Sequence, residues 1–174
     1  MVPVVAHIVI SAPREEVFAF VADLAAREAW TDHYMRDFHL TRPRGSGIGA
    51  AGRFKMEAPG FNTWAEASVA ELDPPRRILE DGRLGRLGRS RCEWTYEFEP
   101  VGGDATRVEI SFSTQPATRL DSFKESFGAR RWYGRQMRAS LERLRQVFEE
   151  RPEKPLARAT VSGYEPLKAA RFGA

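Results

Sequence analysis

Residues 91–99 read Arg-Cys-Glu-Trp-Thr-Tyr-Glu-Phe-Glu, with apolar groups at the even positions and polar groups at the odd ones. This alternation has the two-residue period of a β-strand, in which successive side chains point to opposite faces. Residues 107–113 repeat the pattern, and the Pro-Val-Gly-Gly-Asp of residues 100–104 supplies the glycines that a hairpin loop needs. The two segments predict an antiparallel hairpin with one polar and one apolar face.

Further segments upstream are also typical of strands. Residues 63–72 are β-rich but have a blurred period, which indicates a bulge and leaves open which face points inward. Asp73-Pro74-Pro75 ends that segment, after which the chain returns as a short strand. The whole set predicts seven strands, at residues 4–11, 35–41, 53–57, 63–72, 76–81, 91–99 and 107–113.

Helical patterns bracket the predicted sheet. Pro13 suits a first helical position, and Val17, Phe20, Val21 and Leu24 then follow the spacing of one buried helical face. A second short helical turn is expected over residues 25–30. A long C-terminal helix is predicted from Arg119 to Glu150, with an apolar stripe of Leu120, Phe123, Phe127, Met137, Leu141, Leu144 and Phe148.

The middle of that stripe is unusual, since Arg130 and Gly134 stand where bulky apolar residues are expected. Glycine inside a helix costs about 1 kcal/mol relative to alanine, so packing or space usually explains it. We therefore expect Gly134 to widen a gap between the helix and a curved sheet. The fold class predicted is α+β, a curved seven-stranded antiparallel sheet around a long C-terminal helix, with two short helices after the first strand.

The bulk composition fits one soluble globular domain. The chain has 174 residues, 42% of them hydrophobic and 29% charged, with a formal net charge of +3. The single cysteine, Cys92, excludes an internal disulfide, and the apolar run near the N-terminus is too short for a transmembrane segment. We expect a cytoplasmic protein with a domain over residues 1–150 and a tail over 151–174. The tail is expected to pack back on the domain, with Trp132, off the main stripe, as its candidate dock.

Two stretches resemble a known superfamily. Residues 7–23, His-Ile-Val-Ile-Ser-Ala-Pro-Arg-Glu-Glu-Val-Phe-Ala-Phe-Val-Ala-Asp, followed by Trp30, resemble the entry of the START/polyketide-cyclase (SRPBCC) superfamily, and residues 71–78 resemble its middle strand pair. The resemblance spans about residues 4–150 and implies the helix-grip fold with a cavity for an apolar compound such as a lipid or polyketide. Some members of the superfamily are aromatase/cyclases or dehydratases and others only bind and carry their ligand. The superfamily has no invariant catalytic motif to transfer to this chain.

The residues expected to face the cavity are mostly aromatic. Buried tryptophan and tyrosine need partners for their polar tips, as ligand pockets often provide, although the same residues would also suit a packed core. The ligand-binding set predicted is Trp30, Tyr34, Phe54, Met56, Trp94, Tyr96, Phe98, Phe112, Phe127, Arg130, Gly134 and Met137.

Three residues are candidates for catalysis. Arg130, if buried, would need an anion, and it could stabilise negative charge on a carboxylate or enolate oxygen. The alternative is that Arg130 reaches out to solvent beside Arg131. His33 and Tyr34 could act as general acid and base, or they could form an ordinary cluster at a helix end.

Other kinds of site find little support in the sequence. His7, His33 and His39 lack metal-ligand spacing, so no metal site and no cofactor are predicted. The glycine-rich residues 45–52 lead into a strand and lack the features of a phosphate loop or a dinucleotide fold. The arginines of residues 76–91 have no interleaved aromatics, so nucleic-acid binding is not expected.

Three functions stay open at this point. The first is binding of an apolar or aromatic small molecule, and the second is a polyketide aromatase/cyclase or dehydratase. The third is a protein-interaction module that uses the tail or the arginine-rich hairpin. The ligand, any reaction and the oligomeric state are undetermined by the sequence.

Overall fold

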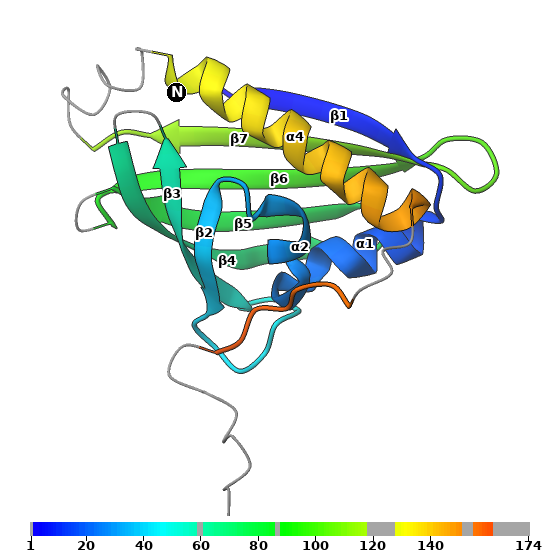
Figure 1. Cartoon of the computed structure of the whole chain (residues 1–174), viewed down its shortest axis with the longest axis horizontal. Coiled ribbons are helices and arrows are strands. Elements are labelled where there is room, and N and C mark those ends of the chain that lie inside the picture. Colours follow the sequence, from blue (N-terminus) through cyan, green and yellow to red (C-terminus); the bar gives the residue numbers. More distant parts are fainter. Residues whose placement is uncertain (1, 59–60, 86–87, 118–127, 151–154, 162–174) are drawn as a thin grey trace, which may run out of the picture.

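The computed structural model describes residues 2–58, 61–85, 88–117, 128–150 and 155–161. One curled sheet and one long helix dominate it (Figure 1). The elements in chain order are β1 (Val4–Ile10), α1 (Arg14–Ala22), the 3-10 turn η1 (Leu24–Ala26), α2 (Glu28–Thr31), β2 (Met35–Leu40), β3 (Ala51–Ala58), β4 (Phe61–Asp73), β5 (Arg77–Leu84), β6 (Ser90–Pro100), β7 (Thr106–Gln115) and α4 (Ala129–Glu149).

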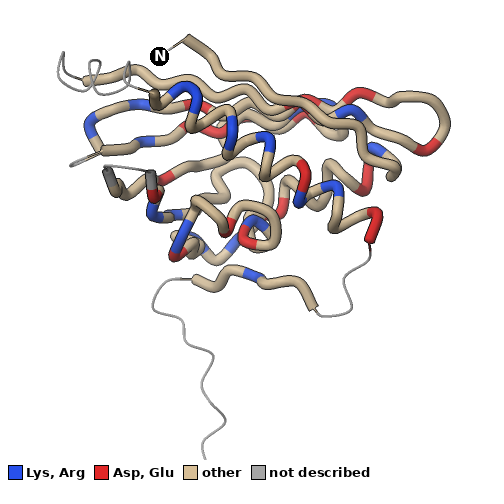
Figure 2. Tube along the Cα trace, turned by 45° about the horizontal axis from the view of Figure 1, so that its top comes forward, with Lys and Arg blue, Asp and Glu red and all other residues tan. Residues whose placement is uncertain are grey.

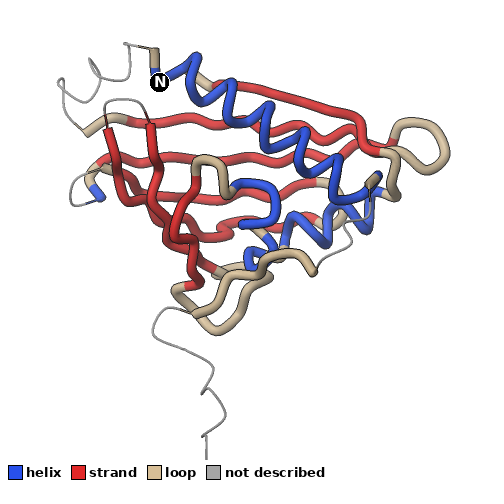
Figure 3. Tube along the Cα trace, viewed as in Figure 1, coloured by secondary structure: helices blue, strands red, loops and turns tan. Residues whose placement is uncertain are grey.

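The seven strands form a single sheet in the order β1-β7-β6-β5-β4-β3-β2, with every pair antiparallel. Figure 3 shows β2 and β3 running steeply across the direction of β6 and β7, so that the sheet curls, and α4 lying diagonally over it. The predicted helix-grip architecture is confirmed, with its seven strands and the short helices α1 and α2 after β1.

Alternation along β6 and β7 builds the concave face of the sheet. Cys92, Trp94, Tyr96 and Phe98 are buried, while the odd-numbered residues between them are exposed or half-buried. Burying an apolar side chain of this size contributes roughly 1.5–3 kcal/mol. The hairpin predicted from residues 91–113 therefore supplies much of the core.

The inward face of β4 is now defined. Ala65, Ala67 and Val69 are buried, and the register against β5 shifts between Val69 and Glu71. The shift confirms the predicted bulge, and it explains the blurred period of this strand, because one extra residue moves later side chains to the other face.

The described part of the C-terminal helix differs from the predicted stripe. Trp132 and Tyr133 are buried at its start, whereas Arg130 is exposed, so the inward position expected for Arg130 is wrong. Trp132 packs edge-on against Tyr34, which contradicts its expected place off the buried face. The expected helical residues 119–127, with Leu120, Phe123 and Phe127, lie outside the described residues.

Part of the segment after α4 returns to the domain. The amide of Ala159 donates to the carbonyl of Ala25, and the amide of Leu40 donates to the carbonyl of Thr160. Val161 forms a parallel bridge with Leu40, at the free edge of β2. Residues 162–174, which include the expected partners of Trp132, lie outside the described residues.

Candidate functional site

A charged pair lies inside the core, between the short helices and the sheet. Nη2 of Arg27 is 2.5 Å from Oε1 of Glu80, and Nη1 is 3.3 Å from Oε2. Both residues are 2% exposed. Two charges taken from water need close pairing to offset the cost of desolvation, and this forked contact provides it.

Local structure explains why each partner points inward. Glu80 follows Ile78 by two residues on β5, so the two side chains share the buried face of that strand. Arg27 stands between η1 and α2, where its carbonyl accepts hydrogen bonds from the amide and the hydroxyl of Thr31. The turn therefore holds Arg27 rigidly above the sheet.

Tyr96 completes this cluster from β6. Its hydroxyl accepts a hydrogen bond of 2.7 Å from Nη1 of Arg27 and lies 3.4 Å from Oε2 of Glu80, to which it donates. Burial raises the pKa of the Tyr96 phenol well above its ordinary value, although Arg27 opposes the shift. Burial acts to lower the pKa of Arg27, but the combined attraction of Glu80 and the neighbouring tyrosines outweighs it and raises that pKa. The cluster holds one cation, one anion and one neutral phenol.

Two buried N–H groups beside this cluster have no acceptor among the described residues. They are Nε of Arg27 and Nε1 of Trp30. The guanidinium of Arg27 lies 5.1 Å from the centre of the Trp30 ring, and Trp30 is 1% exposed. Buried donors are paired in most proteins, and an unpaired one costs about 1–3 kcal/mol. These two groups are therefore able to donate to an acceptor that a ligand would bring.

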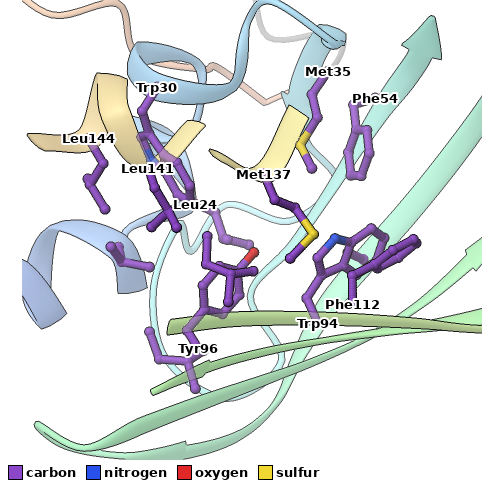
Figure 4. Packing of buried hydrophobic residues seen from close by; sticks show 14 of the residues in the cluster. Leu24, Trp30, Met35, Phe54, Trp94, Tyr96, Phe112, Met137, Leu141 and Leu144 are labelled. Atoms are coloured by element: carbon purple, nitrogen blue, oxygen red, sulfur yellow. The ribbon is translucent and has the colours of Figure 1, made fainter. Parts of the chain in front are cut away.

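An aromatic surface continues from the cluster along the sheet. Trp94 lies 4.7 Å from Phe112 between ring centres, and Phe112 lies 4.5 Å from Tyr133 of α4. Phe54 meets Trp94 edge-on at 6.2 Å. Figure 4 shows Met137 reaching down from α4 toward Trp94, with the hydroxyl of Tyr96 directed up toward the helices.

Tyr34 and His33 lie at the junction of α2, β2 and α4. Burial raises the pKa of Tyr34 to about 12, against the opposing effect of Arg27. His33 places Nε2 3.2 Å from the carbonyl oxygen of Gln136. Because that oxygen can only accept, Nε2 carries the proton and Nδ1 is the free basic nitrogen of the neutral ring. Burial lowers the pKa of His33.

The structure divides the predicted site residues into groups. Trp30 and Tyr96 meet at the polar cluster, at 6.4 Å between ring centres, while Phe98 packs against Phe18 of α1 instead. Phe127 lies outside the described residues. Those that are buried in the core are Trp30, Tyr34, Phe54, Met56, Trp94, Tyr96, Phe98, Phe112 and Met137.

Arg130 and Gly134 lie at a different place from the others. With Val4, Val5, Arg131 and Arg138 they line an open hollow of about 360 Å³ between α4 and the edge strand β1. A Cβ atom at Gly134 would lie 3.4 Å from Cγ1 of Val4. Gly134 therefore faces β1, away from the polar cluster.

A second hollow, of about 570 Å³, follows β4, β5 and β6. Its charged residues pair across the strands in two rows, one with Glu66, Arg83 and Arg91, the other with Asp81 and Glu93. Figure 2 shows both signs of charge spread along the chain. These five residues are three acidic and two basic side chains, so the two signs largely offset each other on this face.

Sequence reasoning missed Arg27 and Glu80, the centre of the site. A signal was present for Glu80, since it shares its strand face with Ile78 and an acidic residue on a buried face requires a partner.

Among the described residues, no three His, Cys, Asp or Glu side chains gather into a metal-binding group. No helix in the described part of the chain is long and apolar enough to cross a membrane.

Comparisons with known proteins agree with this fold. The family model described as polyketide cyclase/dehydrase and lipid transport matches residues 1–149. A solved protein from Thermus thermophilus is 18% identical, with 86% of this chain and 98% of that chain covered and a TM-score of 0.67. A START superfamily protein from Mycobacterium smegmatis is 13% identical, with 86% and 99% covered and a TM-score of 0.64.

A more distant plant protein has the same fold. The major latex-like protein 151 of Panax ginseng is 9% identical, with 84% of this chain and 96% of that chain covered and a TM-score of 0.61. No curated protein matches the sequence. At these identities the solved structures establish the fold alone.

Proposed function

Because the chain belongs to the polyketide cyclase/dehydrase and lipid transport family, we propose that it binds an apolar or aromatic small molecule between the concave face of the sheet and α4. The observation that carries the proposal is the pair of unpartnered buried donors on Arg27 and Trp30. If Arg27 and Trp30 served only to pack the core, apolar side chains at the same two positions would make the protein more stable.

The surroundings of these donors suit such a ligand. Trp94, Phe112 and Tyr133 present ring faces and edges, and Met137 adds a flexible thioether that adapts to irregular shapes. Ligand sites are commonly mostly apolar, with a few polar groups that fix orientation. The family's typical association with hydrophobic ligands supports the same reading.

Extraction and mass spectrometry of the purified protein, combined with titration of a fluorescent apolar probe, test this proposal. Met137→Trp adds bulk beside the aromatic surface and is expected to weaken probe binding at least tenfold. Gln146→Trp places the same side chain at an exposed position of the same helix and is the matched control. Thermal melts establish that both variants fold. Equal probe binding by wild type and Met137→Trp, with no extracted ligand, would contradict the proposal.

A cyclase or dehydratase acting on a polyketide-like substrate is the second candidate function. The observation that favours it is the free Nδ1 of His33, a base whose partner nitrogen is already fixed by Gln136. If His33 acts as a base, His33→Gln should abolish turnover of a bound substrate while leaving its dissociation constant unchanged. Unaltered turnover in that variant would rule out this role.

A further inference from the structure

We propose that the ligand carries a neutral oxygen acceptor, such as a ketone, quinone or ester carbonyl, bound by Nε1 of Trp30 and Nε of Arg27. This inference rests on the proposed function and specifies the ligand's chemistry. It concerns the two buried donors beside the Arg27–Glu80 pair that have no acceptor among the described residues.

The two donors belong to one rigid turn of the chain. The amides of Trp30 and Thr31 both donate to the carbonyl of Arg27, at 3.3 and 3.1 Å. The side chains are stacked, with the guanidinium 5.1 Å from the ring centre of Trp30 and 5.2 Å from that of Tyr96. A donor that is fixed before binding loses little entropy when it meets its acceptor.

The charge of the cluster determines which acceptor fits. The charge of Arg27 is already balanced by Glu80, at 2.5 Å, and the raised pKa values of Tyr34 and Tyr96 keep both phenols neutral. A carboxylate or phosphate ligand would therefore add a net negative charge next to Glu80 in a buried site, where an unpaired charge is costly. A neutral carbonyl oxygen accepts from both donors without that penalty.

The side chains around the two donors indicate what the rest of the ligand must be like. Trp30 and Tyr96 meet edge-on, and Leu141 and Met137 of α4 lie close to them in Figure 4. These groups offer apolar contacts and no further free charge. The ligand expected is an apolar, preferably aromatic, compound with its oxygen directed at the α2 turn.

Three compounds with one tricyclic skeleton separate the possibilities. They are 9-fluorenone, which has a neutral carbonyl, fluorene, which has none, and fluorene-9-carboxylate, which is anionic. Isothermal titration calorimetry is expected to show fluorenone binding about tenfold or more tighter than fluorene, the gain typical of one or two hydrogen bonds. The carboxylate is expected to bind weakest.

Trp30→Phe removes the Nε1 donor and keeps an aromatic ring. It should remove the roughly tenfold preference for fluorenone over fluorene, because the loss of ring area affects both compounds while the loss of the donor affects fluorenone alone. Trp64→Phe alters an exposed tryptophan on β4 and is the control. The carbonyl stretch of bound fluorenone should lie at lower frequency in wild type than in Trp30→Phe.

Each result has a definite meaning. Equal binding of fluorenone and fluorene, unaffected by Trp30→Phe, would overturn the neutral-acceptor inference and leave the proposed ligand-binding function standing. Tighter binding of the carboxylate would overturn the requirement for neutrality. Failure of all three compounds to bind would overturn the inference, whereas the proposed function is overturned only if the fluorescent apolar probe also fails to bind and no ligand is extracted.

Discussion

Arg27 and Glu80 meet at 2.5 Å across the core, although 53 residues separate them in the chain. The contact ties the turn between η1 and α2 to the middle of β5, and Tyr96 on β6 holds it from a third side. Each side chain depends on the other for its charge to be offset, because both are buried in the core.

Glu80→Gln should therefore destabilise the protein by about 3–5 kcal/mol, since it leaves the guanidinium of Arg27 buried without a counter-ion. Urea denaturation measures this change. Glu71→Gln breaks the exposed contact with Arg77 and should cost less than about 1 kcal/mol. The double variant Arg27→Met/Glu80→Leu should recover much of the lost stability. Similar losses in Glu80→Gln and Glu71→Gln would contradict this account.

Alkaline pH should destabilise the fold through Tyr34. Its pKa is about 12 in the folded protein and near 10 when unfolded. As pH rises above 10 the unfolded chain loses this proton first, so stability falls by up to about 1.4 kcal/mol per pH unit until the folded pKa is reached. Denaturation curves at pH 9 and 11 should show a smaller loss in Tyr34→Phe than in wild type. An equal loss in the two proteins would argue against the raised pKa.

Mild acid should destabilise the fold through His33. Burial lowers its pKa below the ordinary value of 6.5, and the nearby cations Arg143 and Arg36 act in the same direction, while Gln136 and Asp32 oppose them. The contribution of His33 to the free energy of unfolding is complete above pH 6.5. It declines as pH falls toward the pKa of His33 in the folded protein, because the unfolded chain takes up the proton first. The melting temperature should drop less between pH 7.5 and 5.5 in His33→Gln than in wild type. Parallel drops would contradict the lowered pKa.

Gly134 should accept alanine but not leucine. Alanine would place its Cβ in ordinary contact with Val4, at 3.4 Å, and should stabilise the helix by up to about 1 kcal/mol. Leucine would force α4 away from β1 and should cost roughly 1–3 kcal/mol. Arg135→Leu, at the next and exposed position, is the control. Stability unchanged by Gly134→Leu would show that this contact is not tight.

The strands could be predicted from the sequence because alternation is a local property. Residues 91–99 and 107–113 lie in β6 and β7 as expected. The buried face of α4 was harder to predict, because the apolar stripe expected from Leu120 to Phe148 has Arg130 in its middle, and Arg130 is exposed. In the structure the large buried side chains at the helix start are Trp132 and Tyr133; Tyr133 packs against Phe112, and Trp132 packs against Tyr34 and Tyr133. Which face of a helix is buried depends on the space that the facing sheet leaves free, and that space cannot be read from the sequence of the helix.

Only one of the two charged residues of the polar cluster could be predicted from the sequence. The period of β5 puts Glu80 on the same face as Ile78, so a buried carboxylate was within reach of sequence reasoning. Its partner was not, because Arg27 stands in a short turn without a recognisable period. The pairing arises from the way that the turn crosses over the sheet, a contact of long sequence separation.

The bridge from Leu40 to Val161 has a practical consequence for anyone who shortens this protein. The family match ends at residue 149, which invites truncation there. The amide of Leu40, now bonded to Thr160, would then be left open on an outermost strand. Bare strand edges recruit other chains and promote aggregation. Residues 155–161 thus cover part of this sheet edge. The protein that keeps them is expected to stay monodisperse at concentrations where the truncated protein self-associates.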